Sequence, residues 1–304
     1  MYYSEYLTSA RVPIFNNTMS SVDKKKNILI TGCSSGIGKC VAKGLADRGY
    51  RVFATARHSA DVESLQSEGF ESIQLDLDSS ESINTAVDEI LRRTNGRIDA
   101  LFNNGAYGQP GAVEDLTRDV LRKQFETNLF GTQELTNRII PVMRKQGHGR
   151  IIQNSSVLGL IVLPYRGAYN ATKFALEALT DTMRLELANT NIHVSLIEPG
   201  PIESLFRKNA YQAYLKNISK ENSEHQQTYL AMEQRLTKPG LAAPFTLPPQ
   251  AVLKKVIHAL ENPNPKIRYY VTFPTYLFAT LRHLLSYRTL DRVLRRVSKD
   301  ENKQ

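Results

Sequence analysis

Short apolar segments alternate with helix-length amphipathic segments along most of this 304-residue chain. The candidate strands are residues 28–31, 51–56, 73–77, 98–103, 150–155, 193–197 and 267–272. The candidate helices are residues 37–47, 80–93, 116–144, 169–188 and 249–260. The strand candidates are continuously apolar, as expected for strands covered on both faces. The alternation predicts an α/β fold: one doubly wound parallel sheet of about seven strands with helices on both faces.

No linker, repeat or low-complexity tract divides the chain, so we expect one domain over residues 27–273. Residues 1–26 are expected to form an irregular arm, with Met19 as an alternative start of translation. A polar stretch with scattered aromatic residues, 203–247, follows the sixth candidate strand. Because open α/β sheets bind ligands at the carboxyl ends of their strands, we expect this insertion to be a substrate loop.

The C-terminal extension, residues 274–304, is basic and amphipathic. Between residues 274 and 297, apolar residues recur among arginines at Leu277, Leu281, Leu284, Leu285, Leu294 and Val297. This spacing predicts one amphipathic helix. Two hypotheses stay open for it: packing beside the substrate entrance or at a subunit contact, or peripheral contact with an anionic membrane surface.

Composition excludes several classes of protein. With 41% hydrophobic and 23% charged residues, the chain has material for a large core and is neither disordered nor fibrous. No apolar run approaches the length of a membrane-spanning helix. Cys33 and Cys40 are too few for a disulfide framework or a four-cysteine zinc site, so we expect free thiols and no metal centre. The N-terminus lacks the apolar core of a secretory signal, which makes the cytoplasm the expected location.

The formal net charge of +9 raises nucleic acid as a partner. Seven Lys/Arg and three Asp/Glu residues lie between Arg282 and Gln304, and the remaining excess is thinly spread. Because the chain also lacks a recognised nucleic-acid-reading motif, we expect no nucleic-acid partner.

A glycine-rich turn joins the first candidate strand to the first candidate helix, with the sequence Thr-Gly-Cys-Ser-Ser-Gly-Ile-Gly over residues 31–38. Gly32 permits a sharp exit from the strand, Gly36 allows close approach to a pyrophosphate, and Gly38 allows the helix to pack tightly on the sheet. A plain tight turn would explain the glycines but not the flanking strand and helix. The pattern predicts a dinucleotide phosphate loop, with the contacts made by Gly32, Ser34, Ser35, Gly36, Ile37 and Gly38.

The end of the second candidate strand bears on the choice of nucleotide. NAD sites usually carry an acid there, which binds the ribose 2′-hydroxyl. Here the strand continues into Arg57, and no acid follows until Asp61. A guanidinium can hold a 2′-phosphate with two hydrogen bonds. The position therefore favours NADP(H) over NAD(H), although a solvated surface arginine is the alternative.

Three side chains form a candidate catalytic group. Tyr169 and Lys173 are four residues apart on a candidate helix, so they share one face. A nearby ammonium favours the phenolate, and we therefore expect Lys173 to lower the pKa of Tyr169. Ser156 follows the fifth candidate strand, where its hydroxyl could donate to a carbonyl oxygen that gains negative charge.

Taken together, these residues resemble the short-chain dehydrogenase/reductase family over residues 27–272. The matching residues are Thr31, Gly32, Gly36 and Gly38, then Asn103-Asn104-Gly105, Asn128, Ser156, Tyr169, Lys173 and Pro199-Gly200. The resemblance implies a Rossmann-like fold. It also implies that Tyr169 is the proton donor in reduction, that Lys173 holds the nicotinamide ribose, that Ser156 orients the carbonyl, and that Asn128 supports a proton-relaying water.

The resemblance implies further cofactor contacts and a substrate class. Asp76 and Leu77 would lie at the adenine, Asn103 at its ribose, and Pro199 to Ile202 along the nicotinamide. The chain is most similar to the retinol and 17β-hydroxysteroid dehydrogenase branch and to bacterial NADP-dependent aldehyde reductases. This similarity implies a carbonyl reductase for a lipophilic aldehyde or ketone, assembled as a homodimer or homotetramer. The alternatives are a 3-oxoacyl, steroid or retinol dehydrogenase, and a non-catalytic NADP(H)-sensing protein.

Overall fold

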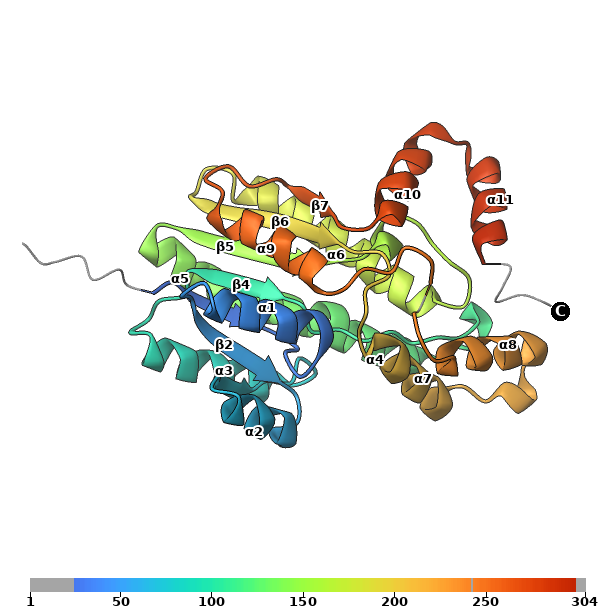
Figure 1. Cartoon of the computed structure of the whole chain (residues 1–304), viewed down its shortest axis with the longest axis horizontal. Helices are drawn as coiled ribbons and strands as arrows, with labels where there is room; N and C mark the ends of the chain where they lie inside the picture. The colour runs from blue at the N-terminus through green and yellow to red at the C-terminus, as the bar shows by residue number, and fades with distance from the viewer. Residues whose placement is uncertain (1–24, 242, 299–304) are drawn as a thin grey trace, which may run out of the picture.

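A seven-stranded parallel sheet lies at the centre of the computed structural model, which describes residues 25–241 and 243–298 (Figure 1). The strand order is β3-β2-β1-β4-β5-β6-β7, and every neighbouring pair is parallel. The strands are β1 (Asn27–Ile30), β2 (Arg51–Ala56), β3 (Glu71–Gln74), β4 (Ala100–Asn103), β5 (Gly149–Asn154), β6 (Ile192–Glu198) and β7 (Arg268–Tyr270). The predicted doubly wound sheet is confirmed. The chain reverses its direction of winding between β1 and β4, and ligands of such sheets bind at this switch point.

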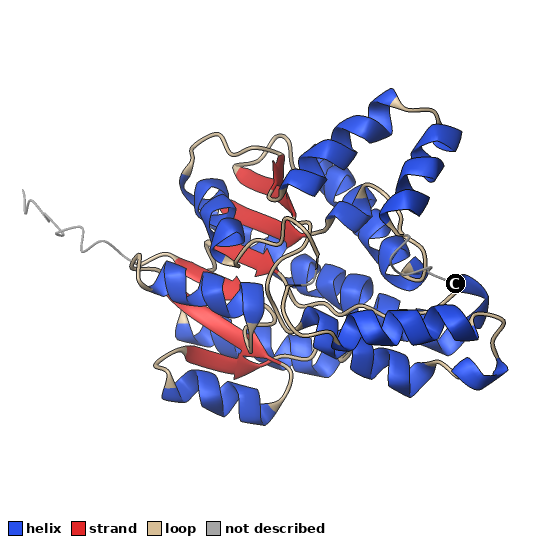
Figure 2. Cartoon of the chain, turned by 45° about the vertical axis from the view of Figure 1, so that its right-hand side comes forward, coloured by secondary structure: helices blue, strands red, loops and turns tan. Residues whose placement is uncertain are grey.

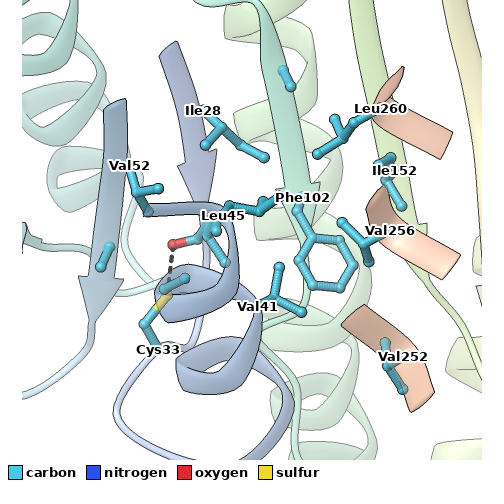
Figure 3. Close-up of a cluster of buried hydrophobic side chains, with 14 of the residues drawn as sticks. Ile28, Cys33, Val41, Leu45, Val52, Phe102, Ile152, Val252, Val256 and Leu260 are labelled. Carbon is cyan, nitrogen blue, oxygen red and sulfur yellow. Dashed lines mark hydrogen bonds between the residues drawn. The ribbon is translucent and has the colours of Figure 1, made fainter. Parts of the chain in front are cut away.

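Helices cover both faces of the sheet (Figures 1 and 2). One face carries α1 (Gly36–Ala46), α2 (Ser59–Ser67) and α9 (Gln250–Glu261), and the other carries α3 (Ser80–Arg93), α5 (Gly131–Gln146) and α6 (Gly167–Glu186). Figure 3 shows the core under the first face, where Val41 and Leu45 of α1 and Val256 of α9 surround Phe102. The sequence analysis missed α2, because this short polar helix buries only Val62 and Leu65.

The stretch predicted as one helix over residues 116–144 is interrupted. A short turn, η1 (Val113–Asp115), precedes α4 (Arg118–Phe125), and the π-helical turn η2 (Glu126–Phe130) separates α4 from α5. Thr117 caps α4 by accepting a hydrogen bond from the Val120 amide at 3.3 Å. The apolar spacing predicted one continuous helix and did not indicate the π turn. Such turns often occur at functional sites.

The insertion at residues 203–247, here called the lid, is mostly helical. It contains α7 (Phe206–Asn217), η4 (Lys220–Asn222) and α8 (Gln226–Thr237). Its ends are fastened together, because the Glu203 amide donates to the Leu247 carbonyl at 3.0 Å and the Leu247 amide donates to the Pro201 carbonyl at 3.2 Å. A small apolar cluster joins the lid to the segment before η1, and its buried members are Ala112, Tyr214, Tyr229, Met232 and Leu236.

The C-terminal segment is a hairpin of two helices, α10 (Phe273–Leu284) and α11 (Tyr287–Val297), so the prediction of one helix over residues 274–297 is wrong. The backbone of Leu285 is extended, which ends α10. The Ser286 side chain then caps the start of α11, so the apolar residues of this segment are divided between two helices. Both helices pack on Ile161 through Phe278, Leu290 and Leu294. We call residues 273–298 the tail hairpin (Figure 1). The arm predicted at residues 1–26 lies almost wholly outside the described residues, as do residues 299–304. Within the described chain, no helix is long and apolar enough to cross a bilayer.

Candidate active site at the carboxyl edge of the sheet

The glycine-rich turn after β1 has the backbone that its sequence predicts. Gly32 and Gly36 have φ values of +70° and +54°, which side chains other than glycine rarely adopt. A Cβ atom at Gly38 would lie 2.1 Å from the Gly32 carbonyl oxygen, so the helix approaches the turn too closely for any side chain. Ser35 caps α1 without a side-chain hydrogen bond, and Ser34 beside it is exposed. The free amides of this helix start fit a pyrophosphate.

Two asparagines that the sequence analysis did not select as site residues fasten this turn to the rest of the sheet. The Asn104 amide nitrogen donates to the Thr31 hydroxyl at 2.9 Å, and Asn104 Nδ2 donates to the Gly32 carbonyl at 3.2 Å. Asn154, at the end of β5, donates through Nδ2 to Asn104 Oδ1 at 2.9 Å. A continuous set of hydrogen bonds therefore links the ends of β1, β4 and β5. Polar residues at the ends of adjacent buried strands were the available sequence signal.

The three predicted catalytic residues come together. Tyr169 and Lys173 lie on one face of α6, and the Lys173 ammonium nitrogen is 5.6 Å from the centre of the Tyr169 ring. Ser156 follows β5, and its hydroxyl is hydrogen-bonded to the Tyr169 phenol. Lys173 is buried, with 3% of its surface exposed, and donates to the Asn154 carbonyl at 2.7 Å. The lysine is thus tied to the same asparagine that fastens the glycine-rich turn.

The proton affinities of this group differ from the sequence-based expectation. Burial raises the pKa of the Tyr169 phenol above its usual value, and the hydrogen bond from Ser156 opposes this only in part. The Lys173 ammonium donates its hydrogen bond to the Asn154 carbonyl at 2.7 Å. Burial also lowers the pKa of Lys173 to about 8, although the Glu177 carboxyl opposes that shift. The phenol therefore keeps its proton at neutral pH.

A buried ionic cluster that the sequence analysis did not identify lies behind Lys173. Arg268 of β7 binds Glu177 of α6 and Glu198 of β6, and it binds Asp181 at 2.6 Å. Glu198 has no exposed surface. Burial raises the pKa of both glutamates, and Arg268 opposes the rise. Glu177 is one helical turn from Lys173, so the cluster places charged groups next to this predicted catalytic lysine.

Asn128 is placed by the π-helical turn. Its side chain accepts from the Tyr107 amide at 3.1 Å and donates to the Tyr107 carbonyl at 2.9 Å. Its Nδ2 also reaches the hydroxyl of Thr172, the neighbour of Lys173, at 3.3 Å. Asn128 thus joins η2 to the loop after β4 and to α6. Its support of a proton-relaying water stays a prediction.

The predicted adenosine contacts, Arg57, Asp76, Leu77 and Asn103, lie at the ends of β2, β3 and β4 but differ in exposure. Among the described residues, the exposed Arg57 side chain bonds only the neighbouring His58, with 3.2 Å between Nε and Nε2. Asp76 accepts from the Asp78 amide at 3.0 Å. Leu77 is buried against Gly105 and Gly131. Asn103 is buried and donates to the Thr136 hydroxyl at 2.8 Å, so its amide nitrogen is already engaged in the core.

The segment after β6 connects the predicted nicotinamide contacts to the lid. The Pro199 carbonyl accepts from the Val157 amide at 2.8 Å, which joins this segment to the turn after Ser156. Ile202 is buried and pairs with Leu247 at the base of the lid. A Cβ atom at Gly36 would lie 2.8 Å from the side chain of Ser204, so the lid base touches the glycine-rich turn.

The lid and the tail hairpin bring apolar side chains to the site. The Phe206 ring of α7 packs edge-on against Tyr169, with 5.3 Å between ring centres, and its outer edge faces Gly108. Phe245 of the lid packs against Phe273 of the tail hairpin with 5.0 Å between ring centres. Several apolar side chains around this region remain exposed: Val162, Leu205, Phe206, Leu241, Phe245 and Phe273.

Comparisons with known proteins agree with this geometry. Residues 26–215 match the family model described as short chain dehydrogenase. The uncharacterized oxidoreductase YbbO of Escherichia coli K12 is 42% identical over 270 residues, which cover 89% of this chain and 94% of that protein. The 17-beta-hydroxysteroid dehydrogenase type 1 of Homo sapiens is 31% identical over 260 residues, covering 81% and 77%. A crystal structure of a short-chain dehydrogenase from Streptomyces avermitilis superposes with a TM-score of 0.72 at 31% identity, covering 91% and 98%.

Proposed function

The chain belongs to the short-chain dehydrogenase/reductase family, and we propose that it reduces lipophilic aldehydes or ketones with NADPH. The observation that carries this proposal is the group Ser156, Tyr169 and Lys173, joined by hydrogen bonds to the glycine-rich turn. A bound nicotinamide dinucleotide would supply the hydride. The protein supplies the position of the substrate, the proton and the electrostatic environment.

In this reaction the carbonyl oxygen of the substrate accepts hydrogen bonds from the Ser156 and Tyr169 hydroxyls. As negative charge develops on that oxygen, the Tyr169 proton transfers to it and Ser156 stabilises the remaining charge. The Tyr169 phenol is protonated at neutral pH, as an ordinary phenol is, so a proton is available when the substrate arrives. Lys173 would hold the nicotinamide ribose, and the amides of the glycine-rich turn would hold the pyrophosphate.

The preference for NADP(H) rests on Arg57. Its guanidinium is exposed at the end of β2 and pairs with no carboxylate among the described residues. It could therefore bind a 2′-phosphate with two hydrogen bonds without first breaking an ion pair. An acid at this position would repel the phosphate instead, and no Asp or Glu lies between Arg51 and Asp61.

The lipophilic substrate class rests on the exposed apolar side chains of the lid and the tail hairpin. Leu205 and Phe273 have 49% and 56% of their surface exposed, and Phe206 covers the Tyr169 ring. A substrate with an alkyl or ring body would remove this surface from water at about 25 cal/mol per Å². The relationship to a human 17-beta-hydroxysteroid dehydrogenase supports the same class.

The experiment is a substrate panel with NADPH and NADH, using aldehydes from acetaldehyde to dodecanal, retinal, 17-ketosteroids and a 3-oxoacyl thioester. We expect NADPH to be preferred and kcat/KM to rise with chain length. Tyr169→Phe should lower kcat about a thousandfold, because a positioned acid contributes factors of about 10² to 10⁴. Its NADPH affinity, measured by fluorescence titration, should be retained.

The matched control is Tyr287→Phe, which removes a phenol with 89% of its surface exposed and should leave kcat unchanged. Turnover retained in Tyr169→Phe would contradict the assignment of the acid. Equal use of NADH would contradict the role of Arg57. A preference for acetaldehyde would contradict the substrate class.

A further inference from the structure

We infer that the tail hairpin is a docking surface for anionic lipid membranes. This inference goes beyond the proposed function, because vesicle binding can be measured without turnover. It rests on three observations: a set of arginines without acidic partners, an exposed apolar tip, and the position of the hairpin beside the catalytic residues.

The charge of the tail hairpin is strongly one-sided. Its arginines are Arg282, Arg288, Arg292, Arg295 and Arg296, all exposed, and Asp291 is its one acid. None of the five forms an ion pair with a residue that the structure describes, whereas Arg48, Arg51 and Arg268 all bind carboxylates. Arg282 instead lies over the Phe174 ring, 5.4 Å from its centre. A row of unpaired guanidinium groups is complementary to a surface of phosphate headgroups.

The tip of the hairpin is apolar. Leu284 has 74% and Tyr287 has 89% of its surface exposed, and both flank the break between α10 and α11. The apolar face of α11 is already covered, because Leu290 and Leu294 are buried against Phe278 and Ile161. The tip therefore does not face the protein core. A leucine and a tyrosine flanked by arginines form the combination that inserts at a membrane interface.

The choice of a lipid surface over other occupants follows from this combination. A second copy docked through the same face would bring like charges together, which is unfavourable. A nucleic acid would match the arginines but would gain little from covering a leucine. Anionic lipid matches both, since headgroups pair with the guanidinium groups while the tip enters the acyl boundary.

The position of the hairpin connects this surface to the site. Val157 and Leu163, in the segment that follows Ser156, pack against the apolar cluster of α10 and α11. Figure 2 shows α10 and α11 projecting from the sheet layer on the side of the carboxyl ends of the strands. The base of the hairpin contacts the lid through Phe273 and Phe245, and its tip points away from α7 and α8 (Figure 1), so α10 connects a membrane-bound tip to the site. Lipophilic substrates concentrate in such a membrane.

The test is co-sedimentation of the full chain with vesicles of phosphatidylcholine alone, or of phosphatidylcholine with phosphatidylglycerol. We expect binding to the anionic vesicles at low salt and its loss in high salt, because screening shortens electrostatic reach. R292E/R295E/R296E should lower the partition coefficient at least about tenfold. L284S/Y287S should lower it about fivefold through the lost insertion of apolar surface. Both variants should keep the wild-type melting temperature and turnover of a water-soluble aldehyde.

A control variant separates a local surface from net charge. K43E/R144E/K145E makes the same charge change with exposed residues of α1 and α5, away from the hairpin, and should bind anionic vesicles almost as wild type does. Equal binding to neutral and anionic vesicles would overturn the inference, as would a control that loses as much binding as the hairpin variant. A hairpin variant that changes the oligomeric state in sedimentation velocity, with wild-type vesicle binding, would assign the face to a subunit contact instead.

Discussion

The carboxyl edge of the sheet and the layer formed by the lid and the tail hairpin are held together by different forces. At the sheet edge, hydrogen bonds and ion pairs join residues far apart in the chain, such as Asn104 to Thr31 and Arg268 to Glu177. The outer layer is held by two small apolar clusters around Tyr229 and Phe278, and it keeps large apolar side chains exposed.

This difference matches the tasks that we propose for the two regions. Hydride and proton transfer need reacting atoms held within a fraction of an ångström, and directional bonds in a buried setting supply that precision. A lipophilic substrate needs surface that can repack around it, and apolar contacts are non-directional. Changes at the sheet edge should therefore affect stability and cofactor binding, whereas changes in the lid should affect substrate selection.

Arg268→Met should have the largest effect on the sheet edge. It leaves the buried Glu177 and Glu198 without their shared cation. We expect a loss of about 3 kcal/mol in the free energy of unfolding, at the low end for buried pairs because the Arg268 side chain is 29% exposed. Urea denaturation measures it. Arg48→Met, which breaks an exposed pair with Glu261, should leave the midpoint nearly unchanged. Similar urea midpoints for Arg268→Met and Arg48→Met would show that the ionic cluster of Arg268 does not stabilise the sheet edge.

Gly38→Ala tests the phosphate turn. Its Cβ would meet the Gly32 carbonyl oxygen at 2.1 Å and Asn104 Nδ2 at 2.7 Å, so the turn must move. We expect NADPH affinity to fall about a hundredfold, because the amides that bind the pyrophosphate lose their positions. Gly44→Ala in the same helix meets only the Leu253 side chain and should cost stability but little affinity. Titration with NADPH distinguishes the two; equal affinities would mean that the turn does not bind phosphate.

Phe206→Ala tests the outer layer. Because its ring covers Tyr169, we expect the KM for a long-chain aldehyde to rise about tenfold, consistent with the apolar surface that a phenylalanine provides. NADPH affinity and the KM for acetaldehyde should stay within about twofold of wild type. Leu215→Ala, at a residue of the same helix with 52% exposed surface, is the control. A change in NADPH affinity instead would place Phe206 with the cofactor.

Glu177→Gln should shift the pH profile slightly. The pKa of Lys173 is about 8 because burial lowers it, and the Glu177 carboxyl opposes this shift. Without that carboxyl the pKa of Lys173 falls further, so the lysine loses its charge at a lower pH. We expect the high-pH limb of kcat/KM to move down by about half a pH unit. Asp181→Asn, which contacts Arg268 but not Lys173, is the control. A high-pH limb that moves to higher pH in Glu177→Gln would contradict the effect that we assign to the Glu177 carboxyl.

Features that depend on a few neighbouring residues were predictable from the sequence. Helix α3 occupies Ser80–Arg93 as predicted, since an amphipathic stretch follows a capping serine at Ser79. The positive φ angles of Gly32 and Gly36 follow from a turn between strand and helix. The shared face of Tyr169 and Lys173 follows from helical geometry alone. Each of these is a local property of backbone sterics and hydrogen bonding.

The features that the sequence analysis missed or misjudged depend on contacts between distant residues. The spacing of Tyr169 and Lys173 was right, but the pKa of Tyr169 is raised rather than lowered, because the phenol is buried. The ionic cluster of Arg268 joins two strands and a helix, and no spacing along the chain indicates it.

By itself, the amino-acid sequence determined the parallel sheet, the glycine-rich turn and which side chains are candidates for catalysis. Periodicity, backbone freedom and side-chain chemistry all depend on a few neighbouring residues. The tertiary structure decided which of those side chains are buried and which oxygen accepts the hydrogen bond of the Lys173 ammonium. It also decided that the tail turns back at Leu285 and leaves its arginines exposed. Burial and electrostatic environment are sums over neighbours brought together only by folding, so no local pattern can specify them.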